Sequence, residues 1–179
     1  MNAVATSTTR VVVWDRVVRF CHWGLALAIG INYFLLSDGE TIHRYIGYFA
    51  LSLVLVRTVW GFVGTPHARF RDFCPTPSRL RQYLQNLRAG NPHPLNGHNP
   101  LGALMIFALW TNVALLGLTG WMQGLDAFWG DDQLHDIHEL LGNVLLGLIG
   151  IHVCAALVMG RIERVRLIRA MVTGVKQRF

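Results

Sequence analysis

Four long apolar stretches dominate the pattern of hydrophobic and polar positions along this chain. They cover about residues 18–36, 42–63, 101–125 and 134–160, and charged side chains are almost absent from them. A helix needs about 20 mainly apolar residues to cross the hydrocarbon core of a bilayer. The pattern therefore predicts an all-α fold, in which one domain over residues 1–179 forms an integral membrane four-helix bundle.

One sizeable polar segment, residues 64–99, separates the second and third stretches. Within it, Thr76 followed by Pro77 is typical of a helix start, and Gly90 is typical of a helix end. The apolar residues between them recur at helical spacing; they are Leu80, Tyr83, Leu84 and Leu87. This spacing predicts a short amphipathic helix on the membrane surface, although a basic loop without a special role fits equally well.

Charge is distributed unevenly between the two sides of such a bundle. All Lys and Arg residues except Arg44 and Arg57 lie in the N-terminal arm, the 64–99 segment or the C-terminal tail. The other connections are acidic; they contain Asp38, Glu40, Asp126, Asp131, Asp132 and Asp136. By the positive-inside rule, both termini and the 64–99 segment are cytoplasmic. The pI of 9.9 then reflects topology and contact with anionic membrane lipid, not binding of nucleic acid.

Four of the five histidines within the apolar stretches fall into two layers. His138 and His152 are fourteen residues apart, which places both on nearly one helix face about 21 Å apart. Because successive spans alternate in direction, His43 is level with His138, and His22 is level with His152. Ionisable residues inside a membrane are costly and usually functional. His135 lies about 100° off the face of His152 and is the weaker rival of His138.

Paired histidines on facing helices are typical of haem ligation. Two neutral imidazoles fill both axial positions of the iron, which favours electron transfer over reaction at the metal. Zinc would require a tighter cluster of ligands, and a proton relay would require carboxylates inside the spans. The sequence thus predicts two b haems stacked across the membrane, one held by His43 and His138 and the other by His22 and His152.

Two further residues are candidates for cofactor binding. Arg57, fourteen residues after His43, lies near the depth of the His22 and His152 pair. Its guanidinium would suit a haem propionate, or it would extend to the lipid headgroups. His98, before Pro100, opens the third stretch and is a candidate contact for a propionate or a quinone. A simple helix-entry turn is the alternative for His98.

Several short motifs in order resemble the bacterial cytochrome b561 family, which includes the b-type cytochrome subunits of nickel–iron hydrogenases. They are RFCHW at residues 19–23, IHRYIG at 42–47, GHNPLG at 97–102 and HELLGN at 138–143. The resemblance extends over about residues 16–171. It implies a four-helix bundle in the bacterial inner membrane, with two haem b groups and electron exchange with a quinone such as ubiquinone. The axial ligands that it implies are His22, His43, His138 and His152.

The resemblance leaves several functions open. Hydrogenase-type members generally carry a further span, for which few residues follow Gly160, so a compact form is favoured over a subunit of a hydrogenase-like complex. Transfer of electrons between the quinone pool and a periplasmic c-type cytochrome or other redox subunit fits best. A superoxide:ubiquinone oxidoreductase would need a positive funnel, yet Arg44 is the only periplasmic cation. A homodimer is compatible, whereas a cofactor-free scaffold or transporter leaves the depth-matched histidines unexplained.

Overall fold

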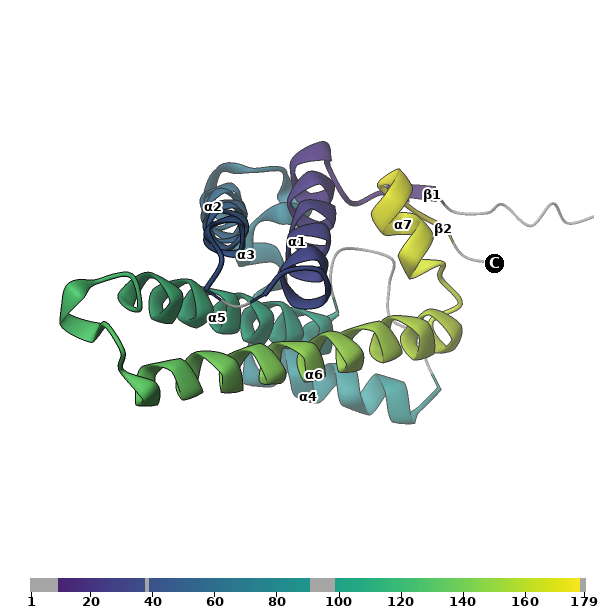
Figure 1. Cartoon of the computed structure of the whole chain (residues 1–179). Coiled ribbons are helices and arrows are strands. Elements are labelled where there is room, and N and C mark those ends of the chain that lie inside the picture. Colours follow the sequence, from purple (N-terminus) through teal and green to yellow (C-terminus); the bar gives the residue numbers. More distant parts are fainter. Residues whose placement is uncertain (1–9, 38, 91–98, 178–179) are drawn as a thin grey trace, which may run out of the picture.

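The computed structural model describes residues 10–37, 39–90 and 99–177, and it is built around four long helices (Figure 1). These are α1 (Arg16–Phe34), α2 (Thr41–Val63), α5 (Pro100–Met122) and α6 (Asp132–Ile162). Each one is long and apolar enough to cross a membrane. The prediction of a mainly helical fold with four stretches long and apolar enough to span a membrane is confirmed, with boundaries that shift by a few residues.

The largest boundary shift is at the end of α5, which stops at Met122 and not near residue 125. Gln123 caps the helix, and Gly124 and Leu125 continue in a turn towards the 3₁₀ helix η2 (Asp126–Phe128). The start of α6 lies slightly earlier than predicted, because the Asp131 side chain accepts a hydrogen bond of 3.0 Å from the backbone N–H of Leu134. Such a side-chain cap fixes a helix start.

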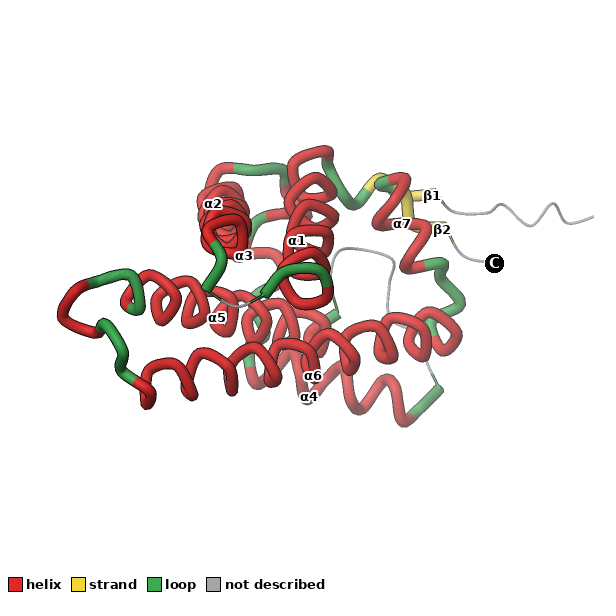
Figure 2. Tube along the Cα trace, in the orientation of Figure 1, coloured by secondary structure: helices red, strands yellow, loops and turns green. Residues whose placement is uncertain are grey.

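The long helices form two antiparallel hairpins that pack against each other. Figure 2 shows α5 and α6 running side by side, with the hairpin of α1 and α2 laid against them. Their shared core is narrow and includes Val54, Val113 and Leu145. Large apolar side chains such as Phe62 and Leu140 remain exposed on the outside. A lipid-facing surface accounts for this distribution, because hydrocarbon is as good a solvent as the protein interior for such side chains.

Short elements cover the end of the bundle at which the described chain starts and stops. They are β1 (Arg10–Val12), η1 (Pro66–Ala68), α3 (Phe70–Phe73), α4 (Pro77–Arg88), α7 (Leu167–Thr173) and β2 (Val175–Gln177). The strands pair antiparallel, with Val11 opposite Lys176. The sequence pattern did not predict this pair. Gly174 makes the turn between α7 and β2 with a φ of 86°, and the turn requires glycine because a Cβ there would lie 2.6 Å from the carbonyl oxygen of Trp14.

The predicted amphipathic helix exists as α4, and it packs on the protein. The Thr76 hydroxyl accepts a hydrogen bond from the N–H of Arg79, which fixes its start. Tyr83 is almost completely buried, and its hydroxyl donates to Oε1 of Glu163 over 3.0 Å. The side chain of Asn99 donates to the same oxygen. Glu163, at the end of α6, therefore holds α4 and the start of α5 together.

Burial shifts the pKa values around this carboxylate. Desolvation and the negative charge of Glu163 raise the pKa of Tyr83 above its usual value of 10.0. Lys176 of β2 is also buried, which lowers the pKa of its ammonium group, while the charge of Glu163 opposes that shift. The carboxylate of Glu163 and the buried Lys176 side chain thus connect the C-terminal strand to the bundle electrostatically.

Asp15 joins the start of α1 to the end of α2. One carboxylate oxygen caps α1 by accepting the N–H of Val18 over 2.9 Å. The other accepts the indole N–H of Trp60 over 2.8 Å and the hydroxyl of Thr65 over 2.7 Å. Partial burial disfavours the charge, but these hydrogen bonds outweigh it and lower the pKa of Asp15 below its usual 3.8.

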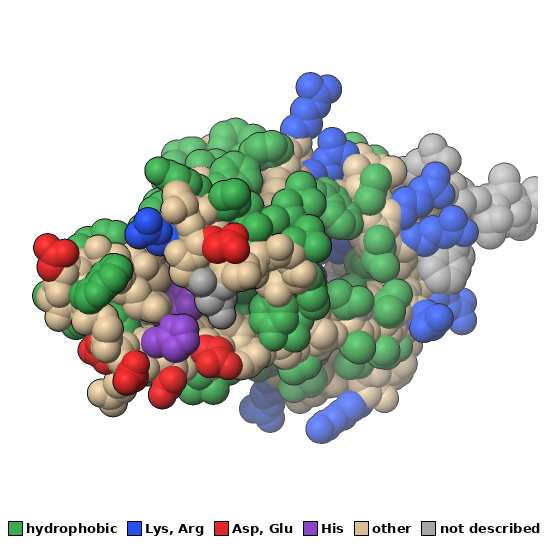
Figure 3. All heavy atoms as spheres, in the orientation of Figure 1, with side chains coloured by type: hydrophobic (Ala, Val, Ile, Leu, Met, Phe, Trp, Pro, Cys, Tyr) green, Lys and Arg blue, Asp and Glu red, His purple; other side chains and the backbone are tan. Residues whose placement is uncertain are grey.

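Charge separates the two ends of the molecule, as Figure 3 shows. Acidic side chains gather around an exposed histidine at the end with the α1–α2 and α5–α6 connections, and Lys and Arg side chains gather towards the other end. We call these the acidic end and the basic end. The separation agrees with the charge pattern of the sequence. A bilayer around the middle of the bundle would leave the charged side chains of both ends in water.

Candidate functional site

Four histidine rings form two pairs, one near each end of the bundle, and the two rings of each pair face each other. The ring centroids of His43 and His138 are 6.3 Å apart, and the ring planes meet at 64°. The centroids of His22 and His152 are 6.2 Å apart, with the planes at 52°. The structure therefore brings together the same two pairs that matched depths suggested. In each pair, one ring comes from α6 and the other from the α1–α2 hairpin.

The helices place these rings by their length and direction. His138 lies in the second turn of α6 and His152 fourteen residues further on, so both project towards the α1–α2 hairpin. His43 lies in the first turn of α2, where the side chain of Asn32 donates a hydrogen bond to its carbonyl oxygen over 3.1 Å. That bond ties the end of α1 to the start of α2. The four histidines are half-buried, between helices and away from the ends of the chain.

The spacing of each pair suits bis-imidazole ligation of one iron. With metal–nitrogen bonds of about 2 Å and a ring centre roughly 1 Å behind each nitrogen, opposed imidazoles have centroids about 6 Å apart. The glycines one turn after His43 and His138 leave space beside that pair. A Cβ at Gly142 would meet nothing within 4 Å, and one at Gly47 would meet only the Asn32 amide nitrogen, at 3.8 Å. A flat macrocycle held by these two histidines would need free space of this kind.

Not every glycine near the histidines serves this purpose. A Cβ at Gly24 would lie 2.8 Å from a methyl group of Leu53, so this glycine allows α1 and α2 to pack closely. Among the described residues, no group of three or more His, Cys, Asp or Glu side chains is arranged to hold a metal ion directly. The donor set of the site thus consists of two separate imidazole pairs, which suits haem better than a bare metal ion.

The His138 ring has a hydrogen-bond partner that the sequence analysis missed. Nδ1 of His138 lies 2.8 Å from the hydroxyl oxygen of Thr119 in α5. The neighbouring Gly120 allows this approach, since a Cβ there would be 3.1 Å from Cε1 of the ring. By contrast, Nδ1 of His22 and Nδ1 of His43 are buried and make no hydrogen bond to any described residue. Thr119 could not have been found from sequence, because its register against α6 is a tertiary property.

Arg57 lies inside the basic end of the bundle and is only 4% exposed. Its Nη2 donates to the carbonyl oxygen of Ala68 over 3.0 Å, and the guanidinium carbon lies 5.3 Å from the ring centroid of Trp110 and 5.8 Å from that of Phe73. Nη1 is buried and makes no hydrogen bond to a described residue. The side chain therefore stays inside the bundle and does not reach out to lipid headgroups.

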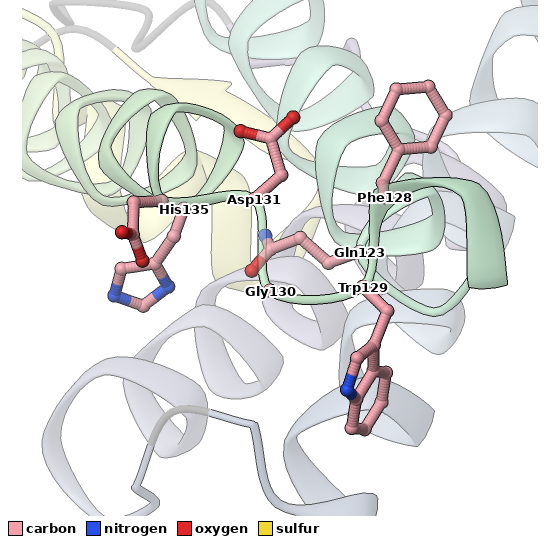
Figure 4. A pocket seen from close by; sticks show the side chains of 7 residues that line it. Gln123, Phe128, Trp129, Gly130, Asp131 and His135 are labelled. Atoms are coloured by element: carbon pink, nitrogen blue, oxygen red, sulfur yellow. The ribbon is translucent and has the colours of Figure 1, made fainter.

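The remaining histidine candidates lie apart from the pairs. His135 is exposed and lines an open hollow of about 380 Å³ at the acidic end. Figure 4 shows this hollow between the α5–α6 connection and the first turn of α6, with Gln123, Trp129 and Asp131 around it. His138, and not His135, faces His43. His98 lies outside the described residues, so its predicted contact stays a prediction.

Comparisons with known proteins identify the family. A family model described as prokaryotic cytochrome b561 matches residues 13–174. A "Probable Ni/Fe-hydrogenase B-type cytochrome subunit" of Bradyrhizobium diazoefficiens is 27% identical, over 97% of this chain and 88% of the relative. A protein with the same description from Azotobacter vinelandii is 29% identical, over 93% of this chain and 88% of the relative.

A similar relative occurs in Rhodobacter capsulatus, at 27% identity over 93% of this chain and 81% of the relative. No solved structure matches the chain. The family match covers all four long helices and both histidine pairs. This chain is thus a b-type cytochrome with haem b as its cofactor, built for transmembrane electron transfer, and it belongs to the prokaryotic cytochrome b561 family.

Proposed function

We propose that this cytochrome holds two haem b groups, one between His43 and His138 and one between His22 and His152, and passes electrons between them across the bacterial inner membrane. The observation that carries the proposal is the pair of centroid distances, 6.3 and 6.2 Å, at two levels of the same helix α6. Two ligand layers about 21 Å apart along α6 divide the membrane into short electron-transfer steps.

The chain's own residues would keep this chemistry to electron transfer. A haem held by each pair would supply a one-electron couple, and ligation by two imidazoles would leave no coordination position open for a substrate. The surrounding apolar side chains of α1, α2, α5 and α6 exclude water, so the charge change on electron transfer requires little solvent rearrangement. The protein tunes the potentials through ligand hydrogen bonds, burial and nearby charge.

We assign the basic end to the cytoplasm and the acidic end to the periplasm, on the positive-inside rule. The charge separation of Figure 3 supports this orientation. The His43 and His138 pair is then the periplasmic haem site, and the His22 and His152 pair is the cytoplasmic one. Arg57, at the basic end, has buried N–H groups suited to a propionate of the cytoplasmic haem. His98 precedes Asn99, the N-cap of α5, and is the second candidate for a propionate or quinone contact at that end.

The redox partners follow from the two faces. A quinone such as ubiquinone dissolves in the bilayer, so it would meet the lipid-facing sides of the helices. The acidic end suits a positively charged periplasmic protein, such as a c-type cytochrome, because complementary charge speeds encounter. The same surface disfavours the anion superoxide as a substrate, so the oxidoreductase alternative is the weaker one.

A second candidate function is favoured by the relatives. Several are described as Ni/Fe-hydrogenase B-type cytochrome subunits, so this chain is a candidate for the membrane subunit of a larger redox complex. Its acidic end would then dock a permanent partner subunit instead of a diffusing one, and a homodimer of the cytochrome is compatible with either arrangement.

Stopped-flow spectroscopy of the haem-loaded protein tests the proposed function. Mixing the oxidised protein with ubiquinol should reduce the haems. The rate constant of this reduction should be of the same order as the rate of steady-state electron transfer from ubiquinol to a cationic cytochrome c. Mixing with superoxide should reduce them far more slowly. Fast reduction by superoxide, with no reaction with quinol, would overturn the assignment in favour of the oxidoreductase alternative.

A further inference from the structure

Thr119 is a hydrogen-bond partner for Nδ1 of His138, whereas Nδ1 of His22 has no such partner among the described residues. The hydroxyl oxygen of Thr119 lies 2.8 Å from Nδ1 of His138. It also lies 2.9 Å from the carbonyl oxygen of Leu115 and 3.2 Å from that of Leu116. Thr119 is 8% exposed, so water does not compete for these bonds.

The direction of the hydrogen bond to His138 follows if Nε2 of that ring binds the iron. Nδ1 then carries the hydrogen of the neutral imidazole and can only donate, so the oxygen of Thr119 accepts it. The single O–H hydrogen of Thr119 is then left for the carbonyl oxygen of Leu115 or Leu116, which can only accept.

We propose that Thr119 is a positioning residue that selects the iron-binding tautomer of His138 and lowers the reduction potential of the haem at the acidic end. A ligating imidazole that donates its second N–H to an acceptor is a more basic ligand. A more basic ligand stabilises ferric iron over ferrous iron, so the potential falls. The inference rests on the proposed bis-histidine ligation.

The arrangement makes the two haem sites unequal. Nδ1 of His22 and of His43 make no hydrogen bond to a described residue, so Thr119 anchors one ligand of one pair. Gly120 strengthens the anchor, because the absence of a Cβ lets the ring approach α5 to within 3.1 Å of the position that a Cβ would occupy. The acidic-end haem should therefore have the more rigid ligand and, through this bond, a lower potential than it would have without Thr119.

Potentiometric titration of Thr119→Val tests the proposal, because valine keeps the shape of threonine and removes the acceptor. The midpoint of one haem should rise while the midpoint of the other stays unchanged. A tenfold change in the ratio of ferric to ferrous stability corresponds to about 59 mV for a one-electron couple. The low-spin ferric EPR signal of the same haem should also shift, since it reports the basicity of the axial imidazoles.

Two variants serve as controls. Thr119→Ser keeps the hydroxyl and should restore the parent midpoint. Thr58→Val removes a hydroxyl that donates to the carbonyl oxygen of Val54 over 2.8 Å, within α2, and it should leave both midpoints unchanged. Unchanged midpoints in Thr119→Val, with both haems present, would overturn the role of Thr119 alone. Absence of a haem ligated by His43 and His138 in the parent protein would overturn the proposed ligation instead.

Discussion

Replacing Asp15 by Ala should destabilise the protein far more than the loss of one helix cap. Asp15 accepts three hydrogen bonds: the cap from Val18, one from the Trp60 indole and one from the Thr65 hydroxyl. Losing an N-cap costs about 1 kcal/mol, and each hydrogen bond to a charged group contributes about 1.5 kcal/mol or more. The sum is about 4 kcal/mol for the free energy of unfolding.

Asp131→Ala is the matched control, because Asp131 caps α6 through the N–H of Leu134 and lies on the exposed surface. It should cost only about 1 kcal/mol. For a chain of this size, 1 kcal/mol shifts the melting temperature by roughly 2–4 °C. Thermal unfolding in detergent, followed by circular dichroism, should therefore show a drop of about 8–16 °C for Asp15→Ala and a few degrees for Asp131→Ala.

The same substitution has a consequence for the site and a pH signature. Asp15 begins the helix that carries His22, so Asp15→Ala should speed loss of the basic-end haem and leave the other haem in place. Because the folded pKa of Asp15 is below 3.8, its stabilisation is present above that pH and is lost as the pH falls through the folded value. Equal melting temperatures for the two alanine variants would refute the three-bond account.

Two further predictions concern the basic end. Arg57→Gln removes a buried cation, and a cation near the iron favours the reduced haem, so one midpoint should fall. For scale, a unit charge ~10 Å from an iron, at an effective dielectric constant near 20, contributes roughly 1.7 kcal/mol, or about 70 mV. Unchanged midpoints in a redox titration would remove Arg57 from the cofactor site. Glu163→Ala removes the carboxylate that accepts hydrogen bonds from the Tyr83 hydroxyl and the Asn99 amide, so amide hydrogen exchange in α4 should accelerate while both haems are retained. The control is Glu139→Ala, at an exposed position of α6. Equal protection of α4 in the two variants would contradict the role of Glu163.

The hydrophobic pattern predicted the long helices well because a bilayer imposes the same requirement on every residue of a span. Their positions in the structure differ by a few residues from the predicted ones, and the differences arise from local caps such as Asp131. The histidine pairs could also be anticipated, since helix rise fixes depth: His138 and His152 lie at two levels of one helix, and alternation of direction sets their partners. The ring distances agree with that reasoning.

Tertiary contacts account for what the sequence did not predict. The strand pair at the basic end joins residues from the two ends of the chain, and each strand has only three residues, too few for a periodic signal. Thr119, Glu163 and Asp15 are ordinary polar residues in sequence, and their partners are distant along the chain or depend on helix register. The sequence is compatible with two positions for the Arg57 side chain, and its burial shows that it stays inside the bundle.

Haem content and optical spectra of the histidine variants test the central claim most directly. The parent protein should bind two b haems per chain. His43→Ala and His138→Ala should lose the same spectral haem, and His22→Ala and His152→Ala should lose the other, because each pair shares one iron. His135→Ala, at the exposed neighbour of His138, should keep both. A single haem per chain in the parent, or loss of a haem in His135→Ala with both retained in His138→Ala, would contradict the assignment of the two pairs.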